Sequence, residues 1–331
     1  MKKSTKRTHK VLNVFLAFIA GILLLSILWV IISQVLTAYE KSIYPAPGEM
    51  VTVSGRQMHV YTQGEGENTI VLTPGLGTTA PVLDFQPLID ELAKTNKVVV
   101  VEPFGYGWSD LTDNERTVEN ITEELRTALS VAGINGPYVL MPHSISGIYA
   151  MYYANTYPEE VKAIIGIDCT LPEMSAYFGE SIPSMPSYLS ALVPTGIARL
   201  LVLMMPNGFL PIDPTHIYSD ENLKTTKVLS AWQAYNKNVV AEGNEIEKNI
   251  EKTSTMKFVK DLPVLIFAKE GTTPREDGKT TQSFYEMALA GLDNSQIVIL
   301  EGHHYLHWTN YETMSNDVSQ FLNSIKTNSS K

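Results

Sequence analysis

A run of 29 uncharged residues, from Val11 to Tyr39, constrains this chain more than any other feature of its sequence. A helix needs about 20 apolar residues to cross a hydrocarbon layer of ~30 Å, whereas the apolar core of a cleaved signal peptide has about 7–15. After the run, Leu36 to Tyr39 offers only a poor match to a signal cleavage site. The run therefore predicts an uncleaved transmembrane signal anchor at residues 11–39, with a cleaved signal peptide as the alternative.

Charge is distributed unevenly around this run. Residues 1–10 carry five basic side chains and no acidic one, so the positive-inside bias predicts a cytoplasmic N-terminus, a single pass through the cell membrane and a soluble part on the extracytoplasmic side. The remainder holds 20 basic and 35 acidic residues. This balance argues against a nucleic-acid partner, because phosphate binding needs a basic surface. Cys169 is the sole cysteine, which excludes an intramolecular disulfide and a thiolate zinc cluster.

Short apolar runs alternate with helical patterns in the first half of the soluble part. Two segments around Gly55 predict a β-hairpin, and four runs too short for helices predict strands. The hairpin segments are 50–54 and 57–62, the strands are 69–73, 97–101, 138–141 and 163–167, and the helices between them are 82–93, 118–132 and 146–155. Continuous apolar strands separated by helices indicate the α/β class, with a doubly wound, mostly parallel sheet covered on both faces.

The alternation breaks after residue 171. Seven of the 18 prolines fall between Pro172 and Pro214, together with the apolar stretch from Ala198 to Met205, and a polar helical stretch follows. Strand patterns resume at 262–268 and 296–300, with helices near 281–290 and 311–325. These shifts predict a basic cytoplasmic segment at 1–10, the anchor at 11–39, a linker at 40–48, the first part of an α/β core at 49–171, an inserted helical cap at 172–258, the second core part at 259–326 and a polar tail at 327–331.

The segment from Pro142 to Gly147 is the strongest local candidate for chemistry. It places Ser144 between a predicted strand and a predicted helix, where a sharp turn lifts the side chain clear of the sheet and the helix N-terminus favours developing negative charge. Pro142 and Ser146 occupy positions at which the usual small-x-Ser-x-Gly pattern has small residues, so the motif is a variant. The alternative is that Ser144 is simply a helix N-cap.

Two further loops can complete a site around this serine. The glycine-rich turn from Pro74 to Thr79 can aim the backbone N–H of Leu76 at an oxyanion, with the N–H of Ile145 as a second donor. After the last predicted strand, Gly302 to Trp308 places histidines where a doubly wound sheet carries ligand-facing groups. Three histidines in five residues also allow a metal site, although no other cluster in the sequence has matching ligand spacing.

With these motifs in this order, the soluble part from about Met50 to Ile325 resembles the α/β-hydrolases. The resemblance is carried by the turn at 74–77, the loop at 105–109, the serine elbow and the histidine pattern at 302–307. It implies that His304 is the catalytic base, with His303 as the alternative. The resemblance also implies hydrolase chemistry with no cofactor and no metal. A serine nucleophile distinguishes this chain from the related dehalogenases and epoxide hydrolases, whose nucleophile is a carboxylate.

The acidic member of a catalytic triad is left open by the sequence. Most relatives place it a few residues after the penultimate strand, at about Thr272, where this chain has no carboxylate. Glu270 lies closer to that strand, and Glu276 and Asp277 lie farther along the loop. A minority of the family takes the acid from the end of the preceding strand, where this chain has Asp168. Adjacent parallel strands end only ~5 Å apart, so both places can reach one histidine. We favour Asp168, with Glu270 as the alternative.

These residues predict a membrane-anchored serine hydrolase that cleaves a carboxylic ester through an acyl-enzyme. Ser144 attacks the acyl carbon, His304 takes the serine proton, and Asp168 orients the imidazole. Methionines at 174, 185, 204 and 205 suggest an adaptable apolar lid and an acyl or lipid-like substrate, with the cap's own core as the alternative. The stretch from Ala198 to Met205 can also be interpreted as a membrane contact beside the anchor.

Two other classes of function stay open. One is an amide or peptide hydrolase with the same triad, in which a cap carboxylate such as Glu173 or Glu180 binds a substrate ammonium. The other is a non-catalytic small-molecule receptor of the same fold. The expected partners are a small ester or amide and the lipid bilayer, and the sequence leaves the oligomeric state open.

Overall fold

The computed structural model describes the backbone of residues 2–271 and 275–329, and the side chains of residues 9–271 and 275–326. The position near Thr272, where most relatives carry their acid, lies outside the described residues. So do the first residue of the predicted basic segment and the last two of the predicted polar tail.

A mixed eight-stranded sheet forms the centre of the soluble part, in the order β1-β2-β4-β3-β5-β6-β7-β8. β1 and β2 form the predicted hairpin, β2 also pairs antiparallel with β4, and every other neighbouring pair is parallel. The strands are β1 (Glu49–Val53), β2 (Arg56–Gln63), β3 (Thr69–Thr73), β4 (Lys97–Val101), β5 (Tyr138–Pro142), β6 (Val161–Ile167), β7 (Val264–Lys269) and β8 (Ser295–Leu300). The predicted α/β class with a mostly parallel sheet is confirmed.

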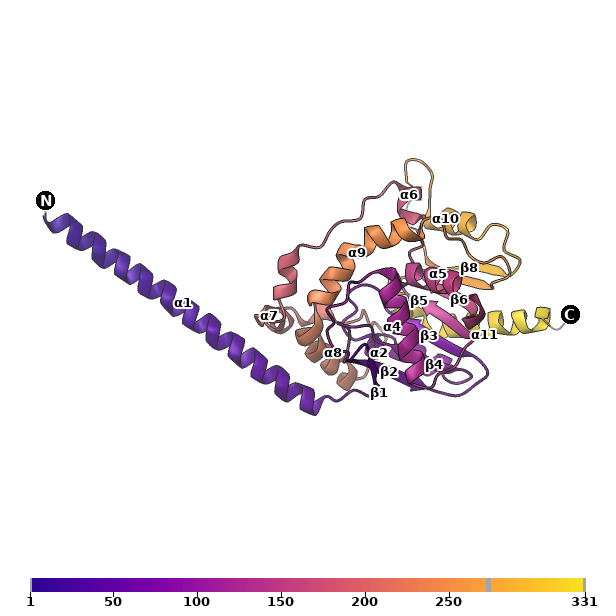
Figure 1. The fold of residues 1–331 in the computed structure, drawn as a ribbon, viewed down its shortest axis with the longest axis horizontal. Coiled ribbons are helices and arrows are strands. Elements are labelled where there is room, and N and C mark those ends of the chain that lie inside the picture. The colour runs from indigo at the N-terminus through magenta and orange to yellow at the C-terminus, as the bar shows by residue number, and fades with distance from the viewer. Residues whose placement is uncertain (1, 272–274, 330–331) are drawn as a thin grey trace.

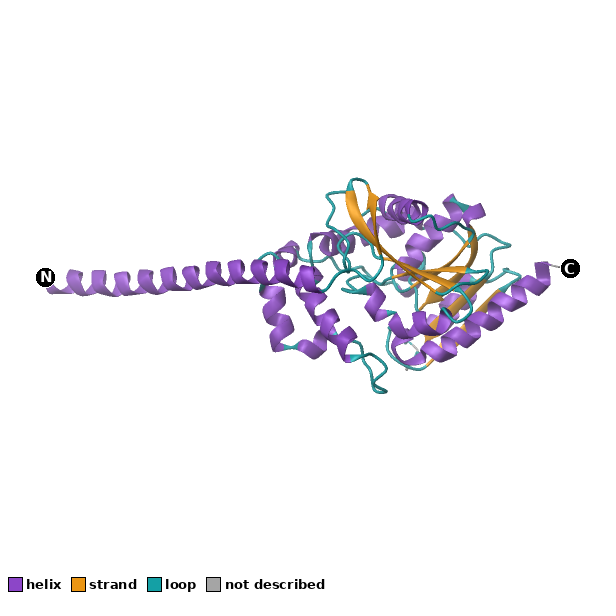
Figure 2. Ribbon diagram, turned by 90° about the horizontal axis from the view of Figure 1, so that it is seen from below, coloured by secondary structure: helices purple, strands orange, loops and turns teal. Residues whose placement is uncertain are grey.

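Helices cover both faces of this sheet (Figure 2). One face packs against α2 (Pro81–Asp84), α3 (Gln86–Leu92) and α11 (His307–Ser329), and the other against α4 (Val118–Val131), α5 (Ser146–Thr156) and α10 (Thr281–Ala288). The short 3-10 helix η1 (Pro158–Glu160) leads into β6. Burial follows the strand alternation, since Val98 and Val100 face one helical layer while Val99 and Val101 face the other. All four are buried, as expected for continuous apolar strands.

The helix predicted at 82–93 is divided in the structure. α2 ends at Asp84 and α3 begins at Gln86, with Phe85 between them. Pro87 explains the break, because proline has no N–H to continue the helical hydrogen bonds and its ring crowds the preceding turn. Both pieces still bury their apolar side chains against the sheet.

The insertion, residues 172–258, lies between β6 and β7 and is largely helical. Its elements are α6 (Met174–Phe178), η2 (Ser187–Ala191), α7 (Ile197–Met204), η3 (Pro206–Phe209), α8 (Asp220–Gln233) and α9 (Lys237–Thr253). The turn between α8 and α9 packs on the loop after β4, where Asn236 donates to the carbonyl of Gly105 at 2.6 Å. Gln233 donates to the carbonyl of Gly107 at 2.9 Å, so side-chain amides fix the insertion to the core.

Helix α1 (Lys2–Ile43) extends away from the globular part as a single rod (Figures 1 and 2). Between His9 and Ile43 it is long and apolar enough to cross a membrane, and the side chains at its centre are exposed, Leu24 and Leu25 by 68% each. The helix also includes the first four residues of the predicted linker, so 40–43 are helical.

Contacts of Glu40 explain why helix α1 continues into the predicted linker. The Glu40 carboxylate receives two hydrogen bonds of 2.6 Å from the guanidinium of Arg199 in α7 and a third, of 2.8 Å, from Trp232 Nε1 in α8. Arg199 also donates to Thr37 Oγ1 at 2.8 Å. The arginine side chain is only 8% exposed, so α1 is attached to the insertion through a nearly buried ion pair.

Replacing Arg199 by methionine should reduce stability sharply. Removing one partner of a buried ion pair leaves the other charge uncompensated, which costs about 3–5 kcal/mol, whereas an exposed pair contributes about 0.2–1 kcal/mol. Denaturant unfolding of the detergent-solubilised full chain measures the loss, and Lys257→Met, at the exposed pair with Glu173, is the matched control. The double variant Glu40→Gln, Arg199→Met should recover part of the loss. Equal stability of Arg199→Met and Lys257→Met would contradict this role of the pair.

Candidate functional site

Ser144 stands at a sharp turn between β5 and α5. Its backbone has φ = 53°, a left-handed conformation that is uncommon for residues other than glycine. The turn is held by hydrogen bonds from the N–H of Ser144 to the carbonyl of Ile167 and from the N–H of Thr170 to the carbonyl of Ser144. Gly147 is required at this turn, because an added Cβ would lie 2.4 Å from the carbonyl oxygen of Thr170. The structure therefore has the strained strand-turn-helix geometry that the sequence predicts around Ser144.

The side chains of Ser144, His304 and Asp168 form one hydrogen-bonded chain. His304 Nε2 lies 2.9 Å from Ser144 Oγ, and His304 Nδ1 lies 2.6 Å from Asp168 Oδ2. A carboxylate only accepts hydrogen bonds, so Nδ1 carries the hydrogen and Nε2 is free to accept the serine proton. The Asp168 side chain is 13% exposed and that of His304 is 41% exposed, which leaves the serine end reachable from outside.

Asp168 follows β6 directly and also adopts a positive φ, of 39°. The N–H of Lys269, at the end of the neighbouring β7, donates to Asp168 Oδ1 at 3.2 Å. Glu270 follows β7, but its side chain is exposed and, among the described residues, has no hydrogen bond to His304. Of the two carboxylates left open by the sequence, the structure brings Asp168 to the histidine.

The loop that carries His304 is fixed by groups on both sides. Asp84 accepts hydrogen bonds from His307 Nε2 at 2.7 Å and from Trp308 Nε1 at 2.8 Å. His143 lies below the loop, and its Nε2 donates to the carbonyl of His304 at 3.3 Å. Burial lowers the pKa of His143 well below its ordinary value, so this side chain is neutral and packs beneath the site. Asp84 is a positioning residue that no local sequence pattern indicated.

Among the described residues, His304 and not His303, the alternative base, is hydrogen-bonded to Ser144. Its ring stacks on Trp308 at a centroid distance of 5.2 Å, and its Nδ1 accepts from the N–H of Tyr305. With His304 and His307 bound to separate carboxylates, the three histidines do not converge. Within the described residues, no group of three or more His, Cys, Asp or Glu side chains is placed to hold a metal ion.

The turn after β3 approaches the serine closely. A Cβ on Gly75 would lie 3.0 Å from Ser144 Cβ and 2.8 Å from His143 Nδ1, so only glycine fits there. Within the described residues, neither the N–H of Leu76 nor that of Ile145 donates a hydrogen bond. Among the described residues, both predicted oxyanion donors are therefore without an internal acceptor, as the predicted role requires.

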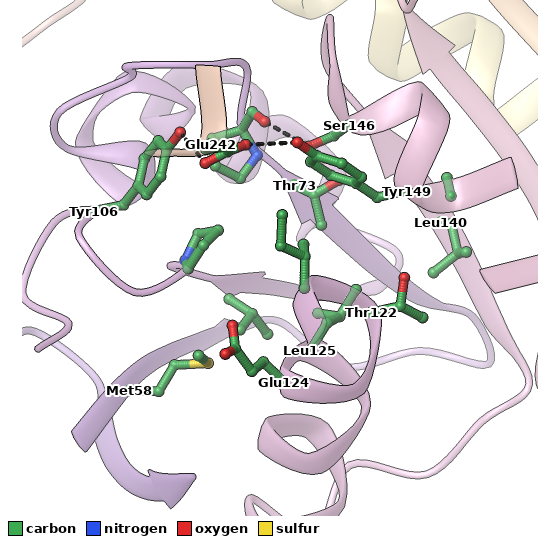
Figure 3. Close-up of a pocket in the computed structure, with 15 residues that line it drawn as sticks. Met58, Thr73, Tyr106, Thr122, Glu124, Leu125, Leu140, Ser146, Tyr149 and Glu242 are labelled. Atoms are coloured by element: carbon green, nitrogen blue, oxygen red, sulfur yellow. Dashed lines mark hydrogen bonds between the residues drawn. The ribbon is translucent and has the colours of Figure 1, made fainter. Parts of the chain in front are cut away.

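Behind this turn lies a buried polar network that the sequence did not indicate (Figure 3). Glu242, from α9 of the insertion, accepts hydrogen bonds from the hydroxyls of Tyr106 at 2.7 Å and Tyr149 at 2.9 Å. The hydroxyl of Tyr106 in turn accepts from the N–H of Gly77 at 3.2 Å. Tyr106, Tyr149 and Glu242 border a cavity of about 30 Å³, large enough for a water molecule. The insertion thus reaches the turn at 74–79 through Glu242 and Tyr106.

Glu242 should make stability depend on pH. Burial raises the pKa of Glu242, against the opposing effects of the Arg116 guanidinium and the two tyrosine hydroxyls. A carboxyl whose folded-state pKa is raised contributes stability below its unfolded-state pKa and loses it as the pH rises through the folded-state value. A tenfold change in the proton affinity of one group is worth about 1.4 kcal/mol. The stability of Glu242→Gln minus that of the parent chain should therefore increase as the pH rises from about 5 to about 8. Urea unfolding at both pH values tests this, and a constant difference would contradict it.

A cleft of about 330 Å³ lies between the turn at 74–79 and the insertion. The wall on the core side includes Leu76, from the turn after β3, and Tyr305, which follows His304. The opposite wall is formed by Met185, the segment from Gly208 to Pro211, and Tyr235. Its volume is at the lower end of the roughly 300–1,000 Å³ that is usual for small-molecule sites, so the cleft suits a single small ligand.

Comparisons with known proteins identify the class. No protein-family model matches the chain. The uncharacterized protein YbdG of Bacillus subtilis is 31% identical over 319 residues, which cover 91% of this chain and 94% of YbdG. The mouse serine hydrolase BPHL is 30% identical over 123 residues, or 35% of this chain and 40% of that protein.

Two solved structures show the same fold at low sequence identity. The epoxide hydrolase VrEH1 of Vigna radiata has a TM-score of 0.61 and 18% identity, covering 83% of this chain and 97% of its own. CarC, a serine hydrolase involved in carbazole degradation, has a TM-score of 0.57 and 16% identity, covering 83% and 98%. The chain belongs to the same family as YbdG and has the α/β-hydrolase fold, which confirms the predicted resemblance.

Proposed function

We propose that this chain is a membrane-anchored serine hydrolase that cleaves a carboxylic ester. The observation that carries the proposal is the hydrogen-bonded chain from Ser144 through His304 to Asp168, with Ser144 held at a positive φ beside Gly75. In this mechanism His304 Nε2 takes the proton from Ser144 Oγ as the oxygen attacks the acyl carbon. The alcohol leaves with that proton, and water then hydrolyses the acyl-enzyme by the same route.

The backbone N–H groups of Leu76 and Ile145 are proposed to bind the oxyanion of the tetrahedral intermediate. Two donors aimed at developing charge in a partly enclosed site stabilise the transition state, and loss of one typically lowers turnover by about 10²–10³-fold. Tyr106 would support this turn by holding the N–H of Gly77. No step of this mechanism requires a cofactor.

An ester is favoured over a peptide by the surroundings of the two carboxylates considered for ammonium binding. Glu173 pairs with Lys257, and Glu180 pairs with Arg275 of the second core part, both at exposed positions. Each carboxylate is already matched by a cation, so neither offers an unpaired negative charge to a substrate amine. Hydrolysis of p-nitrophenyl esters compared with aminoacyl p-nitroanilides by the purified full chain tests the assignment. Faster turnover of the anilides would replace ester hydrolysis with amide hydrolysis.

We also propose a domain arrangement and a location. Residues 49–171 and 259–326 form the catalytic core, 172–258 cap it, and 11–39 span the cell membrane with the N-terminus in the cytoplasm. The support is the length and exposure of α1 and the basic composition of residues 1–10. Protease added to intact cells should then degrade the soluble part, and protection of that part until lysis would reverse the orientation.

A further inference from the structure

Helix α7 of the insertion exposes an apolar face. Ile197, Leu200, Leu203 and Met204 recur at helical spacing on one side, and Leu203 and Met204 are 67% and 76% exposed. The opposite side, with Arg199, is buried. We define these four exposed side chains as the α7 face. An apolar patch on one side of a surface helix is typical of a contact with another apolar phase.

The chain around the α7 face is depleted of charge. From residue 181 to residue 212 the sequence contains one charged side chain, Arg199, and that charge is bound to Glu40 of α1. A surface in water normally carries many charged side chains, and a surface between proteins usually keeps a polar rim. A bilayer excludes unpaired charge, so this composition fits lipid better than either.

The α7 face continues the lipid-facing surface of α1. Trp29 Nε1 donates to the carbonyl of Gly196 at 3.1 Å, which fixes the start of α7 beside α1 (Figure 1). On its other sides this part of α1 remains apolar and exposed, for example at Val35 by 63% and Tyr39 by 61%. An uncharged run of 29 residues is about 44 Å long as a helix, more than the ~30 Å of the hydrocarbon layer. The part of the helix that exceeds the thickness of the hydrocarbon layer is the part that α7 contacts. This puts α7 at the level of the membrane surface.

The α7 face also leads directly into the cleft. Met204 is followed by η3, and Gly208 to Pro211 form the wall of the cleft opposite Leu76 and Tyr305. Phe209, Leu210 and Pro211 give this wall an apolar lining. A molecule that leaves the bilayer along α7 would therefore meet the cleft without crossing a charged surface.

We propose that the α7 face rests in the adjacent leaflet and that the substrate is a single-chain acyl ester that enters the cleft from the bilayer past η3. The substrate part of this inference rests on the proposed ester hydrolase function, whereas the membrane contact does not. A volume of about 330 Å³ suits one acyl chain better than two.

The membrane contact is tested with the full chain in phosphatidylcholine vesicles. Leu203→Cys carries an environment-sensitive fluorophore, and the native Cys169 is fully buried, so unmodified chain is the labelling control. Val131→Cys is the matched exposed position. Val131 is the last residue of α4, which ends where the strands begin, at the edge of the sheet opposite the insertion. Nitroxide-labelled lipid should quench the Leu203 label about twofold or more beyond the Val131 label. Equal quenching overturns the contact, as does cross-linking of Leu203→Cys between two copies without lipid quenching.

Entry from the bilayer is tested with the double variant Leu203→Glu, Met204→Glu. Its turnover of a long-chain monoacyl ester embedded in vesicles should fall about tenfold or more, while hydrolysis of a short water-soluble ester stays within about twofold of the parent. Val131→Glu should leave both rates unchanged. An equal effect on both esters, or no effect on either, overturns entry from the bilayer. If the parent chain hydrolyses neither ester, the proposed function fails, and the quenching result still decides the membrane contact.

Discussion

Replacing Ser144 by alanine is expected to lower turnover of a p-nitrophenyl ester by about 10⁴-fold or more. The substitution removes the only oxygen that lies within hydrogen-bond reach of His304 Nε2 among the described side chains. The oxyanion donors are backbone groups and remain, so a small residual rate is expected. Steady-state kinetics of the purified full chain gives the number.

A matched control separates lost chemistry from lost structure. Ser146 is the neighbouring serine, and its hydroxyl donates to the carbonyl of Pro74 at 2.6 Å. Ser146→Ala removes a structural hydrogen bond and should reduce activity far less than Ser144→Ala. Circular dichroism should show both variants folded. If Ser144→Ala retains parental turnover, Ser144 is not the nucleophile.

Replacing Asp168 by asparagine is expected to lower turnover by about 10⁴-fold at neutral pH, while Glu270→Gln should change it by less than about twofold. The amide of asparagine can donate to His304 Nδ1, which favours the tautomer that carries its hydrogen on Nε2. That nitrogen then faces Ser144 Oγ as a donor and cannot accept the serine proton. The two carboxylates follow adjacent strands, so the pair of variants is matched in position.

The kinetic constants separate the two possibilities further. A group that acts only on the histidine should lower kcat with little change in KM. Loss of activity in Glu270→Gln with parental activity in Asp168→Asn would move the acid to the loop after β7. Equal losses in both variants would indicate that neither acts through His304 alone.

Much of the fold follows from local sequence. The strands were recognisable because a parallel sheet buried on both faces requires continuous apolar runs such as 97–101. The turns at Ser144 and His304 were recognisable because they follow those runs, at the sheet edge where ligand-facing groups gather. Helix boundaries were less predictable, since a single residue, Pro87, divides α2 from α3.

The sequence favoured Asp168 over Glu270 but left the choice open, because both follow neighbouring strands. It depends on where each side chain points once β6 and β7 are paired, and the structure directs Asp168 to His304. Contacts between segments that are far apart in the sequence could not be predicted either. Arg199 meets Glu40 across 159 residues, and Glu242 meets Tyr106 across 136. The one available signal was Arg199 itself, a lone charge in an otherwise uncharged stretch.

The most direct test of the proposed nucleophile is the mass of a covalent adduct. The full chain is treated with a fluorophosphonate, which reacts with activated serines, and digested for peptide mass spectrometry. One adduct per chain on the peptide that contains Ser144, formed in step with the loss of ester hydrolysis, is the expected result. An adduct on a different residue, or none while ester hydrolysis continues, would contradict the assignment of Ser144 as the nucleophile.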